Sequence, residues 1–414
     1  MSALIIRFAN NRIGMGLSKR DIFLNSIGQT TTYSLAFEVE KAEGIYIYDT
    51  SGKRYFDLNS GISVSSLGHR HPKVIRAIKE QLDKHMHTMV YGEHIQSSQL
   101  AFAELLSRQL DPSLNCIYYL SSGSEVLEVA MKLAKRATGR YEIISCSNAY
   151  HGSTQGSECL RSDHDYSRAF LPLLPGVRHI EFNNEEDLEK ISCRTAAVIL
   201  EPVQAEAGVY PPQNNYLKKV QERCKLTNTL FILDEIQTGF GRTGHLFAHQ
   251  KYGVLPDLLC IGKAMGGGMP IGGLVGHKKL INLFSKNPDL GHITTFGGHP
   301  VMCAAAHGSL QALLEENIVD SVLEKETFIR NKLQHKIINE IRSSGMMMAV
   351  ELTKRKYLKH VVNNAFEQGA LIDYFLFNNK SFRLAPPLIY TLKELDEACD
   401  ILLKAMDYAQ SKYK

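Results

Sequence analysis

Residues 229–234, Thr-Leu-Phe-Ile-Leu-Asp, and residues 258–263, Leu-Leu-Cys-Ile-Gly-Lys, decide the expected fold of this 414-residue chain. Each is a short apolar run that leads to a charged residue. Comparable apolar runs occupy residues 116–120, 142–146 and 196–200, and helical stretches separate them. Uninterrupted apolar strands that alternate with helices are typical of a parallel sheet covered on both faces. We therefore expect an α/β fold built on such a sheet.

Polar residues stand at equivalent positions in these runs. Ser121, Glu201, Asp234 and Lys263 each lie at or just past the end of an expected strand. In open α/β sheets, ligands bind at the carboxyl ends of the strands. The sequence therefore predicts a binding site where these side chains meet.

The two ends of the chain predict a smaller α+β unit. Residues 35–58 contain alternating strands around an Asp-Thr-Ser-Gly turn, which indicates an antiparallel hairpin or meander. From about residue 300 the pattern becomes helical, with helices expected at 304–315 and 317–341. A strand at 346–351 and a helix at 392–412 follow.

The bulk composition excludes several classes of protein. Hydrophobic residues make up 44% and charged residues 22% of the chain, and the formal net charge of +4 gives no reason to expect nucleic acid as a partner. Eight scattered cysteines without metal-ligand spacing indicate reduced thiols in a cytoplasmic protein, and no metal site is expected. No apolar run approaches the roughly 20 residues that span a bilayer, so no membrane partner is expected.

The N-terminal segment allows two interpretations. It carries basic residues and no acidic residue before Asp21, as a transit peptide does. The spacing Ser18-x-x-Asp21 also matches a helix capping box. We favour a capped helix that begins after Ser18.

The turn Ser121–Glu125 is a candidate anion site. It contains Gly123 and links an expected strand to a helix that begins near Ser124. Such a turn presents free N–H groups and the positive end of the helix dipole to an anion. Alone it is more often a simple cap, just as Asp234 alone is a possible helix cap and Lys263 alone a solvated charge.

Residues 234–244, Asp-Glu-Ile-Gln-Thr-Gly-Phe-Gly-Arg-Thr-Gly, followed by Lys263, resemble the signature of the class III (ornithine, acetylornithine and 4-aminobutyrate type) aminotransferases. Residues 201–208, 294–300 and 382–387 resemble three further segments of that family. The resemblance implies fold type I of the pyridoxal-phosphate enzymes, with a mostly parallel sheet in the large domain. Both ends of the chain would then combine into the small α+β domain.

The domain limits follow from these segments. We expect residues 1–65 to form the N-terminal part of the small domain and residues 306–414 its C-terminal part. Residues 66–305 would form the large domain that binds the cofactor.

The resemblance places the cofactor, pyridoxal 5′-phosphate, at the strand ends. Lys263 would form the Schiff base, and Asp234 would hold the pyridine nitrogen protonated. The other cofactor-binding residues that it implies are Ser122, Gly123 and Ser124 at the phosphate, Tyr150 over the ring with His151 beside it, and Gln237 at the phenolic oxygen.

Substrate-binding residues are implied in the same way. Arg383 would bind the α-carboxylate of the 2-oxo acid as a bidentate fork. Glu206, from the segment that begins at Glu201, would pair with Arg383 when no α-carboxylate is bound. Thr295 would reach the cofactor phosphate of a neighbouring subunit, so a homodimer is expected. His299 stands where the family usually has asparagine.

The implied activity is that of an aminotransferase. An ω-amine donor of the acetylornithine, ornithine, diamine or 4-aminobutyrate type would supply an amino group to 2-oxoglutarate by a ping-pong mechanism through Lys263. Aminomutases and decarboxylases share this fold, and fold does not determine function. A non-enzymatic phosphate- or nucleotide-binding protein is a remote alternative, because neither a Gly-x-Gly-x-x-Gly turn after the first strand nor a P-loop is present.

One departure concerns the donor. Ornithine and acetylornithine aminotransferases usually carry arginine two residues after the position of His151, where it binds the α-carboxylate of the donor. Here that position is Ser153, and Arg161 is a candidate for replacing the missing arginine. Because serine cannot form the ion pair, the sequence favours a diamine or another ω-amine over a plain ornithine-type donor.

Overall fold

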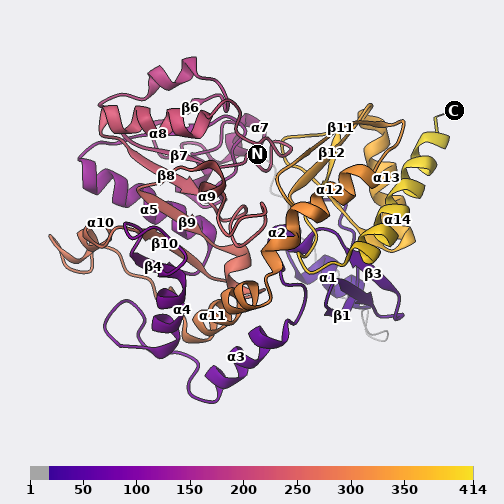
Figure 1. Ribbon diagram of the computed structural model, residues 1–414, viewed down its shortest axis with the longest axis horizontal. Helices are drawn as coiled ribbons and strands as arrows, with labels where there is room; N and C mark the ends of the chain where they lie inside the picture. The colour runs from indigo at the N-terminus through magenta and orange to yellow at the C-terminus, as the bar shows by residue number, and fades with distance from the viewer. Residues whose placement is uncertain (1–17, 414) are drawn as a thin grey trace, which may run out of the picture.

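The computed structural model describes residues 18–413, and its largest sheet has seven strands in the order β4-β10-β9-β8-β7-β5-β6 (Figure 1). These strands are β4 (Cys116–Leu120), β5 (Glu142–Cys146), β6 (Val177–Ile180), β7 (Thr195–Leu200), β8 (Leu230–Asp234), β9 (Leu258–Ile261) and β10 (Gly272–Gly276). The pairs β5–β6, β5–β7, β7–β8 and β8–β9 are parallel, whereas β10 runs antiparallel to β4 and β9. The expected mostly parallel sheet is confirmed.

Helices connect and cover the strands. The α-helices are α1 (Lys19–Ser26), α2 (Ser60–Ser63), α3 (Pro72–Leu82), α4 (Ser97–Ser107), α5 (Gly123–Thr138), α6 (Gln155–Glu158), α7 (His164–Ser167), α8 (Tyr216–Thr227), α9 (Ala248–Tyr252), α10 (Lys278–Ile281), α11 (Pro300–Glu315), α12 (Val322–Lys332), α13 (Arg355–Gln368) and α14 (Leu392–Ser411). The predicted capped helix start is confirmed, because Ser18 and Asp21 form a capping box at α1. No helix among residues 18–413 is both long and apolar enough to cross a membrane.

Successive residues of the central strands pack on opposite faces of the large sheet. Phe231 and Leu233 of β8 belong to a core that includes side chains of α8 and α11. Ile232 between them packs instead with side chains of α5. A strand buried on both faces needs apolar side chains at every position, which is why these strands appear in the sequence as continuous apolar runs.

Two strands of this sheet were not predicted, β6 and β10. β6 lies at the sheet edge and has the sequence Val-Arg-His-Ile, whose polar residues interrupt the apolar pattern. β10 is Gly-Gly-Leu-Val-Gly, and glycine weakens a strand interior. Its glycines are needed for close packing, because a Cβ on Gly272 would lie 2.7 Å from the carbonyl oxygen of Ser122.

Both ends of the chain share the smaller part of the molecule. One four-stranded sheet has the order β1-β2-β3-β13, from β1 (Val39–Glu43), β2 (Tyr46–Asp49), β3 (Arg54–Asp57) and β13 (Ala370–Leu371). The second has the order β11-β12-β15-β14, from β11 (Ile338–Ser343), β12 (Met348–Leu352), β14 (Asp373–Tyr374) and β15 (Ser381–Leu384). In Figure 1 the indigo N-terminal strands and the yellow C-terminal helices lie together on one side of the molecule.

The expected meander at the N-terminus is confirmed by the antiparallel pairs β1–β2 and β2–β3. β13, from the C-terminal region, pairs in parallel with β3 and so joins the two ends of the chain. The fold is therefore that of the expected large domain with a small α+β domain built from both termini. The domain limits at residues 65 and 305 stay a prediction.

The long helix expected at residues 317–341 is wrong. α12 ends at Lys332, and residues 338–343 form strand β11 instead. β11 pairs antiparallel with β12, and the backbone N–H of Ile338 donates to the carbonyl of His335 in the turn before it. The helical spacing of apolar residues extends into this segment, but its β-branched isoleucines favour a strand once an antiparallel partner lies beside it.

Candidate active site

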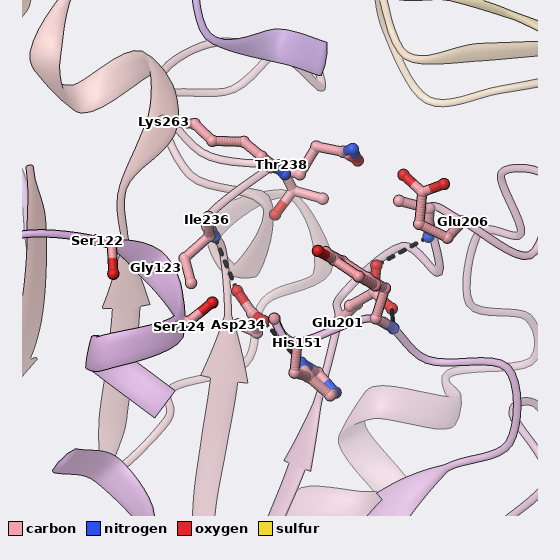
Figure 2. A pocket seen from close by; sticks show the side chains of 14 residues that line it. Ser122, Gly123, Ser124, His151, Glu201, Glu206, Asp234, Ile236, Thr238 and Lys263 are labelled. Atoms are coloured by element: carbon pink, nitrogen blue, oxygen red, sulfur yellow. Dashed lines mark hydrogen bonds and ion pairs between the residues drawn. The ribbon is translucent and has the colours of Figure 1, made fainter. Parts of the chain in front are cut away.

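A cavity opens at the carboxyl edge of the large sheet, where β7, β8 and β9 end. It is lined by Ser122, Gly123, Ser124, Tyr150, His151, Gly152, Glu201, Ala205, Glu206, Asp234, Ile236, Gln237, Thr238 and Lys263 (Figure 2). The structure therefore brings together all of the predicted cofactor- and substrate-binding residues except Thr295 and Arg383. Ser121, which was also predicted to meet them at the strand ends, does not line the cavity. Figure 2 shows the start of α5 on one side of the cavity and Glu206 on the other.

The N-terminus of α5 stands where an anion cradle is expected. Ser122 is the N-cap, and its hydroxyl accepts a hydrogen bond of 3.3 Å from the backbone N–H of Glu125. The preceding N–H groups, of Gly123 and Ser124, have no hydrogen-bond partner in the described part of the chain. Free first-turn N–H groups and the helix dipole suit a phosphate.

Gly152 allows the chain after β5 to approach this cradle. Its φ angle is +127°, and a Cβ at this position would lie 2.1 Å from the Ser124 hydroxyl oxygen. Any side chain at residue 152 would therefore displace Ser124 or strain the backbone. The glycine keeps Ser124 at the edge of the cavity.

His151 and Asp234 form a buried pair at the floor of the cavity. The His151 Nδ1 atom lies 2.7 Å from Asp234 Oδ2, and the exposed fractions of the two side chains are 0% and 5%. The other carboxylate oxygen accepts a 3.0 Å hydrogen bond from the backbone N–H of Ile236. Burial opposes the charged imidazole, but the hydrogen bond and the negative charge of Asp234 outweigh it, and the pKa of His151 is raised.

Glu201 is a second buried carboxylate at this edge. Its oxygens accept backbone hydrogen bonds from Tyr150, at 3.2 Å, and from Ala205, at 2.9 Å. Burial raises the pKa of Glu201 to about 7, although the nearby His151 and these two hydrogen bonds act in the opposite direction. Glu201 is thus placed to hold the loops after β5 and β7 together.

Lys263 follows the end of β9, as expected, in a backbone conformation that the sequence did not indicate. Its φ angle is +46°, in the left-handed region that lysine rarely adopts. Such strain is retained where the surrounding structure enforces it, and it is common at active sites. Burial lowers the pKa of the Lys263 ammonium group, while the carboxylates of Glu206 and Asp234 oppose that shift.

Arg383 lies behind the cavity wall rather than in its lining. Its Nη2 atom lies 2.6 Å from Glu206 Oε2, and both side chains are buried, with exposed fractions of 4% and 6%. Its guanidinium carbon lies 4.6 Å from the ring centroid of Phe375. Nε and Nη1 of Arg383 have no hydrogen-bond partner among residues 18–413, so two donors remain available for an oxyanion.

Thr295 lies outside the cavity, in an exposed loop before α11. The neighbouring Thr294 ties this loop to the first turn of α5, since its hydroxyl donates a 3.0 Å hydrogen bond to Glu125. Half or more of the Ile293 and Phe296 side chains is exposed. Within this chain, Thr295 therefore does not reach the residues of the cavity.

Ser153 is exposed to solvent, whereas Arg161 is buried and ion-paired. Ser153 is exposed, and its hydroxyl lies 3.4 Å from that of Tyr150. Arg161 is 7% exposed and already forms ion pairs with Glu158, at 3.2 Å, and with Asp163, at 3.0 Å. Its guanidinium carbon also lies 5.7 Å from the ring centroid of Tyr150.

Four further residues line the cavity and were not predicted from the sequence, Gly152, Ala205, Ile236 and Thr238. Ile236 packs against the helix start, because a Cβ on Gly123 would lie 3.0 Å from its side chain. Each of the four lies within two residues of a predicted site residue. Adjacency in the motifs was therefore the only available signal, and it does not tell which side chains face the cavity.

Comparison with known proteins assigns the family. A family model described as "Aminotransferase class-III" matches residues 28–406. The chain belongs to the class III aminotransferases. An acetylornithine aminotransferase from Clostridium acetobutylicum is 34% identical over 92% of this chain and 98% of its own length. A putrescine aminotransferase from Pectobacterium atrosepticum is 36% identical over 86% of this chain and 80% of its own length.

A solved structure agrees with this family assignment. The ornithine aminotransferase of Toxoplasma gondii, with partial occupancy of PLP in its active site, has a TM-score of 0.87 and 28% identity to this class III aminotransferase. The match covers 94% of this chain and 93% of that one. The protein is therefore a transferase that depends on pyridoxal 5′-phosphate.

The cavity of this class III aminotransferase fits that cofactor. The free N–H groups at the start of α5 suit its phosphate, and the buried carboxylate of Asp234 suits a protonated pyridine nitrogen. Lys263 lies in the same cavity with a lowered pKa, as an amine that must react with an aldehyde requires. When bound, the cofactor supplies an electron sink for the bonds at the substrate's amine carbon.

We expect Gly152→Ala to weaken cofactor binding at least about tenfold, because the added methyl group overlaps Ser124 in the phosphate cradle. The measurement is a titration of the cofactor-free protein with pyridoxal 5′-phosphate. Gly139→Ala is the matched control, since Gly139 also has a positive φ angle but has nothing within 4 Å of its Cβ position. Equal affinities in the two variants would contradict the assigned cradle.

Glu201→Gln should change how stability depends on pH. The ordinary pKa of 4.5 rises to about 7 in the folded protein, so the proton is held more tightly there than in the unfolded chain. The stabilisation from this proton, about 3 kcal/mol by linkage, is lost as the pH rises through about 7. We therefore expect the Tm of the wild type minus the Tm of the variant, both measured without cofactor, to be lower at pH 8 than at pH 5. A Tm difference that is the same at both pH values would contradict the raised pKa.

Proposed function

We propose that this aminotransferase moves an amino group from an ω-amine donor, of the diamine, acetylornithine, ornithine or 4-aminobutyrate type, to 2-oxoglutarate in a ping-pong reaction that uses Lys263. The buried Glu206–Arg383 pair beside the Lys263 cavity carries this proposal. An arginine receives an α-carboxylate as a fork, and a glutamate neutralises the same arginine when the substrate has none. One cavity can then accept both a substrate with an α-carboxylate and one without.

The unequal bonding of Arg383 supports this exchange. Glu206 engages only Nη2, and it also accepts a 3.3 Å hydrogen bond from the backbone N–H of Leu376. Movement of Glu206 away from Arg383 would expose the whole guanidinium edge to an incoming carboxylate. A buried pair that loses one partner is strongly destabilised, so the glutamate should leave only when a carboxylate takes its place.

The surroundings of Tyr150 support a donor without an α-carboxylate. Ser153 offers only a hydroxyl, and the Arg161 guanidinium is already paired through Nη1 with Glu158 and through Nε with Asp163, which leaves only its Nη2 unbonded. The net charge of this cluster is negative, since two carboxylates face one arginine. A second amino group is accommodated there more readily than a carboxylate, as a diamine donor requires.

Lys263 is the proposed proton carrier. Because burial lowers its pKa, a larger fraction of the side chain is the neutral amine near neutral pH. The neutral amine could take a proton from the substrate's amine-bearing carbon and would return it to the cofactor carbon on the other side of the amine nitrogen, two bonds away. The His151–Asp234 pair would keep the Asp234 carboxylate oriented toward the pyridine nitrogen during that transfer.

We also propose a homodimer in which Thr295 binds the cofactor phosphate of the other subunit. The loop that carries Thr295 is exposed but anchored to α5 through Thr294. Its apolar side chains Ile293 and Phe296 are 50% and 57% exposed, which suits burial against a second copy.

Lys263→Ala should abolish multiple turnover and leave the cofactor bound but removable. In the wild type, borohydride should fix the cofactor covalently, and a donor alone should convert it to its pyridoxamine form. Neither should occur in the variant, as absorbance and mass measurements would show. Lys251→Ala is the control, because Lys251 also has a pKa lowered by burial but bonds Ser344 outside the cavity. Wild-type turnover in Lys263→Ala would overturn the proposal, and a wild type that donors never convert would point to an aminomutase or decarboxylase.

Ser153→Arg should favour α-amino-acid donors over diamines, because the new guanidinium can pair with an α-carboxylate but repels a second ammonium. We expect the ratio of kcat/KM values to shift by at least about tenfold, roughly the effect of one charge-assisted hydrogen bond. A donor panel of ornithine, acetylornithine, lysine, putrescine, 4-aminobutyrate and β-alanine with 2-oxoglutarate measures the shift. Ser153→Ala controls for loss of the hydroxyl, and an unchanged preference in Ser153→Arg would remove the argument.

A further inference from the structure

Arg242 is a fully buried arginine whose role the active-site chemistry does not explain. It lies in the loop after β8, downstream of Asp234, and its exposed fraction is 0%. It does not line the cavity. All of its hydrogen bonds go to neutral groups. Burial lowers the pKa of Arg242 to about 9, and the negative charge of Asp57 opposes this shift only in part.

The guanidinium joins three parts of the chain. Nη1 donates to the carbonyl oxygens of Met346, at 2.9 Å, and Pro386, at 2.6 Å. Nη2 donates to the hydroxyls of Ser60, at 3.3 Å, and Ser66, at 3.0 Å. In Figure 1, α2, which contains Ser60, lies between the large sheet and the C-terminal strands. Arg242 therefore links the cofactor loop to both ends of the chain.

Both carbonyl acceptors flank the strands that hold Arg383. Met346 lies two residues before the start of β12, and Pro386 lies two residues after the end of β15. In this antiparallel pair Met348 lies opposite Leu384, and Ala349 lies opposite Arg383. Nη1 of Arg242 thus bonds the segments next to both strands at one end of the β12–β15 pair, close to the register position of Arg383.

Backbone contacts reinforce this junction. The N–H of Met346 donates to the carbonyl oxygen of Arg242 at 3.0 Å. The Ser60 hydroxyl donates to the carbonyl oxygen of Ala385 at 2.6 Å. A displacement of the 385–388 segment would therefore be passed to Arg383, which lies on the same strand end.

The chemistry of the contacts specifies arginine. The planar guanidinium directs several N–H groups at fixed angles, whereas lysine offers a single rotating ammonium on a flexible stem. A lysine would keep the charge but could not span two carbonyl and two hydroxyl groups. The buried guanidinium thus has a structural role, because its hydrogen bonds fix the distance between the loop after Asp234 and β15.

We propose that Arg242 is a positioning residue that sets where Arg383 stands relative to Lys263, and that it thereby controls affinity for substrates bearing an α-carboxylate. This rests on the proposed role of Arg383 as the carboxylate receptor. The half-reaction with the 2-oxo acid would then depend on Arg242, a residue that touches neither substrate nor cofactor.

The test is Arg242→Lys in the holoenzyme. We expect the KM for 2-oxoglutarate and the Kd for glutarate, measured by calorimetry, to rise at least about tenfold. Conversion of the cofactor by a donor without an α-carboxylate should change less than about threefold. Hydrogen exchange in residues 383–388 should become faster. Equal loss in both half-reactions, or an unchanged glutarate Kd, would overturn the proposal.

Two further variants complete the test. Arg140→Lys is the matched control, because Arg140 also bonds backbone carbonyls, of Thr195, Thr227 and Asn228, but at the opposite edge of the large sheet. If Arg242→Lys does not fold, Ser66→Ala removes one Nη2 acceptor. It should raise the Kd for glutarate by a smaller factor and leave conversion of the cofactor by a donor without an α-carboxylate nearly unchanged. An unchanged glutarate Kd in this variant would then overturn the proposal. Arg383→Lys separates the two proposals: if it leaves the glutarate Kd unchanged, the proposed function fails as well.

Discussion

The large sheet is buried on both faces, and this burial determines where the chain can place its polar side chains. Side chains along β7, β8 and β9 alternate between two hydrophobic cores, so an unpaired polar group inside a strand would be costly. In these three strands, polar side chains stand only at or just beyond the strand ends. Since neighbouring parallel strands end at the same edge, the chemistry of Glu201, Asp234 and Lys263 is gathered there by the same burial that stabilises the fold.

The charged groups at this edge are mutually dependent. Asp234 holds His151, Glu206 holds Arg383, and the carboxylates oppose the lowering of the Lys263 pKa by burial. Removal of one partner leaves another charge buried without compensation. The positive φ angle of Lys263 and the raised pKa of Glu201 are costs of the same kind, and they persist because the surrounding core enforces them.

Much of the cavity could be predicted, because its residues sit in local motifs. The cap at Ser122, the strand end at Asp234 and the glycines after Lys263 are each specified by a few consecutive residues. The strand β10 and the break between α12 and β11 could not be predicted in this way. Gly272 of β10 is required by its close approach to Ser122 and Val126 at the start of α5, and β11 is a strand only because β12 lies beside it.

Apolar periodicity and local motifs were sufficient to predict the α/β class and the residue types at the strand ends, because neither needs a tertiary partner. The resemblance to the class III family added the cofactor. The folded chain, in contrast, was needed to show which arginine nitrogens are left without a hydrogen-bond partner. Arg383 retains two unbonded nitrogens, Nε and Nη1, beside Glu206. Arg161 is shared between two carboxylates and keeps only Nη2 unbonded, and Arg242 is bonded to neutral groups from both ends of the chain and keeps only Nε unbonded. The physical reason is that a guanidinium's availability depends on its hydrogen-bond partners, and most partners of Arg383 and Arg242 come from distant parts of the sequence.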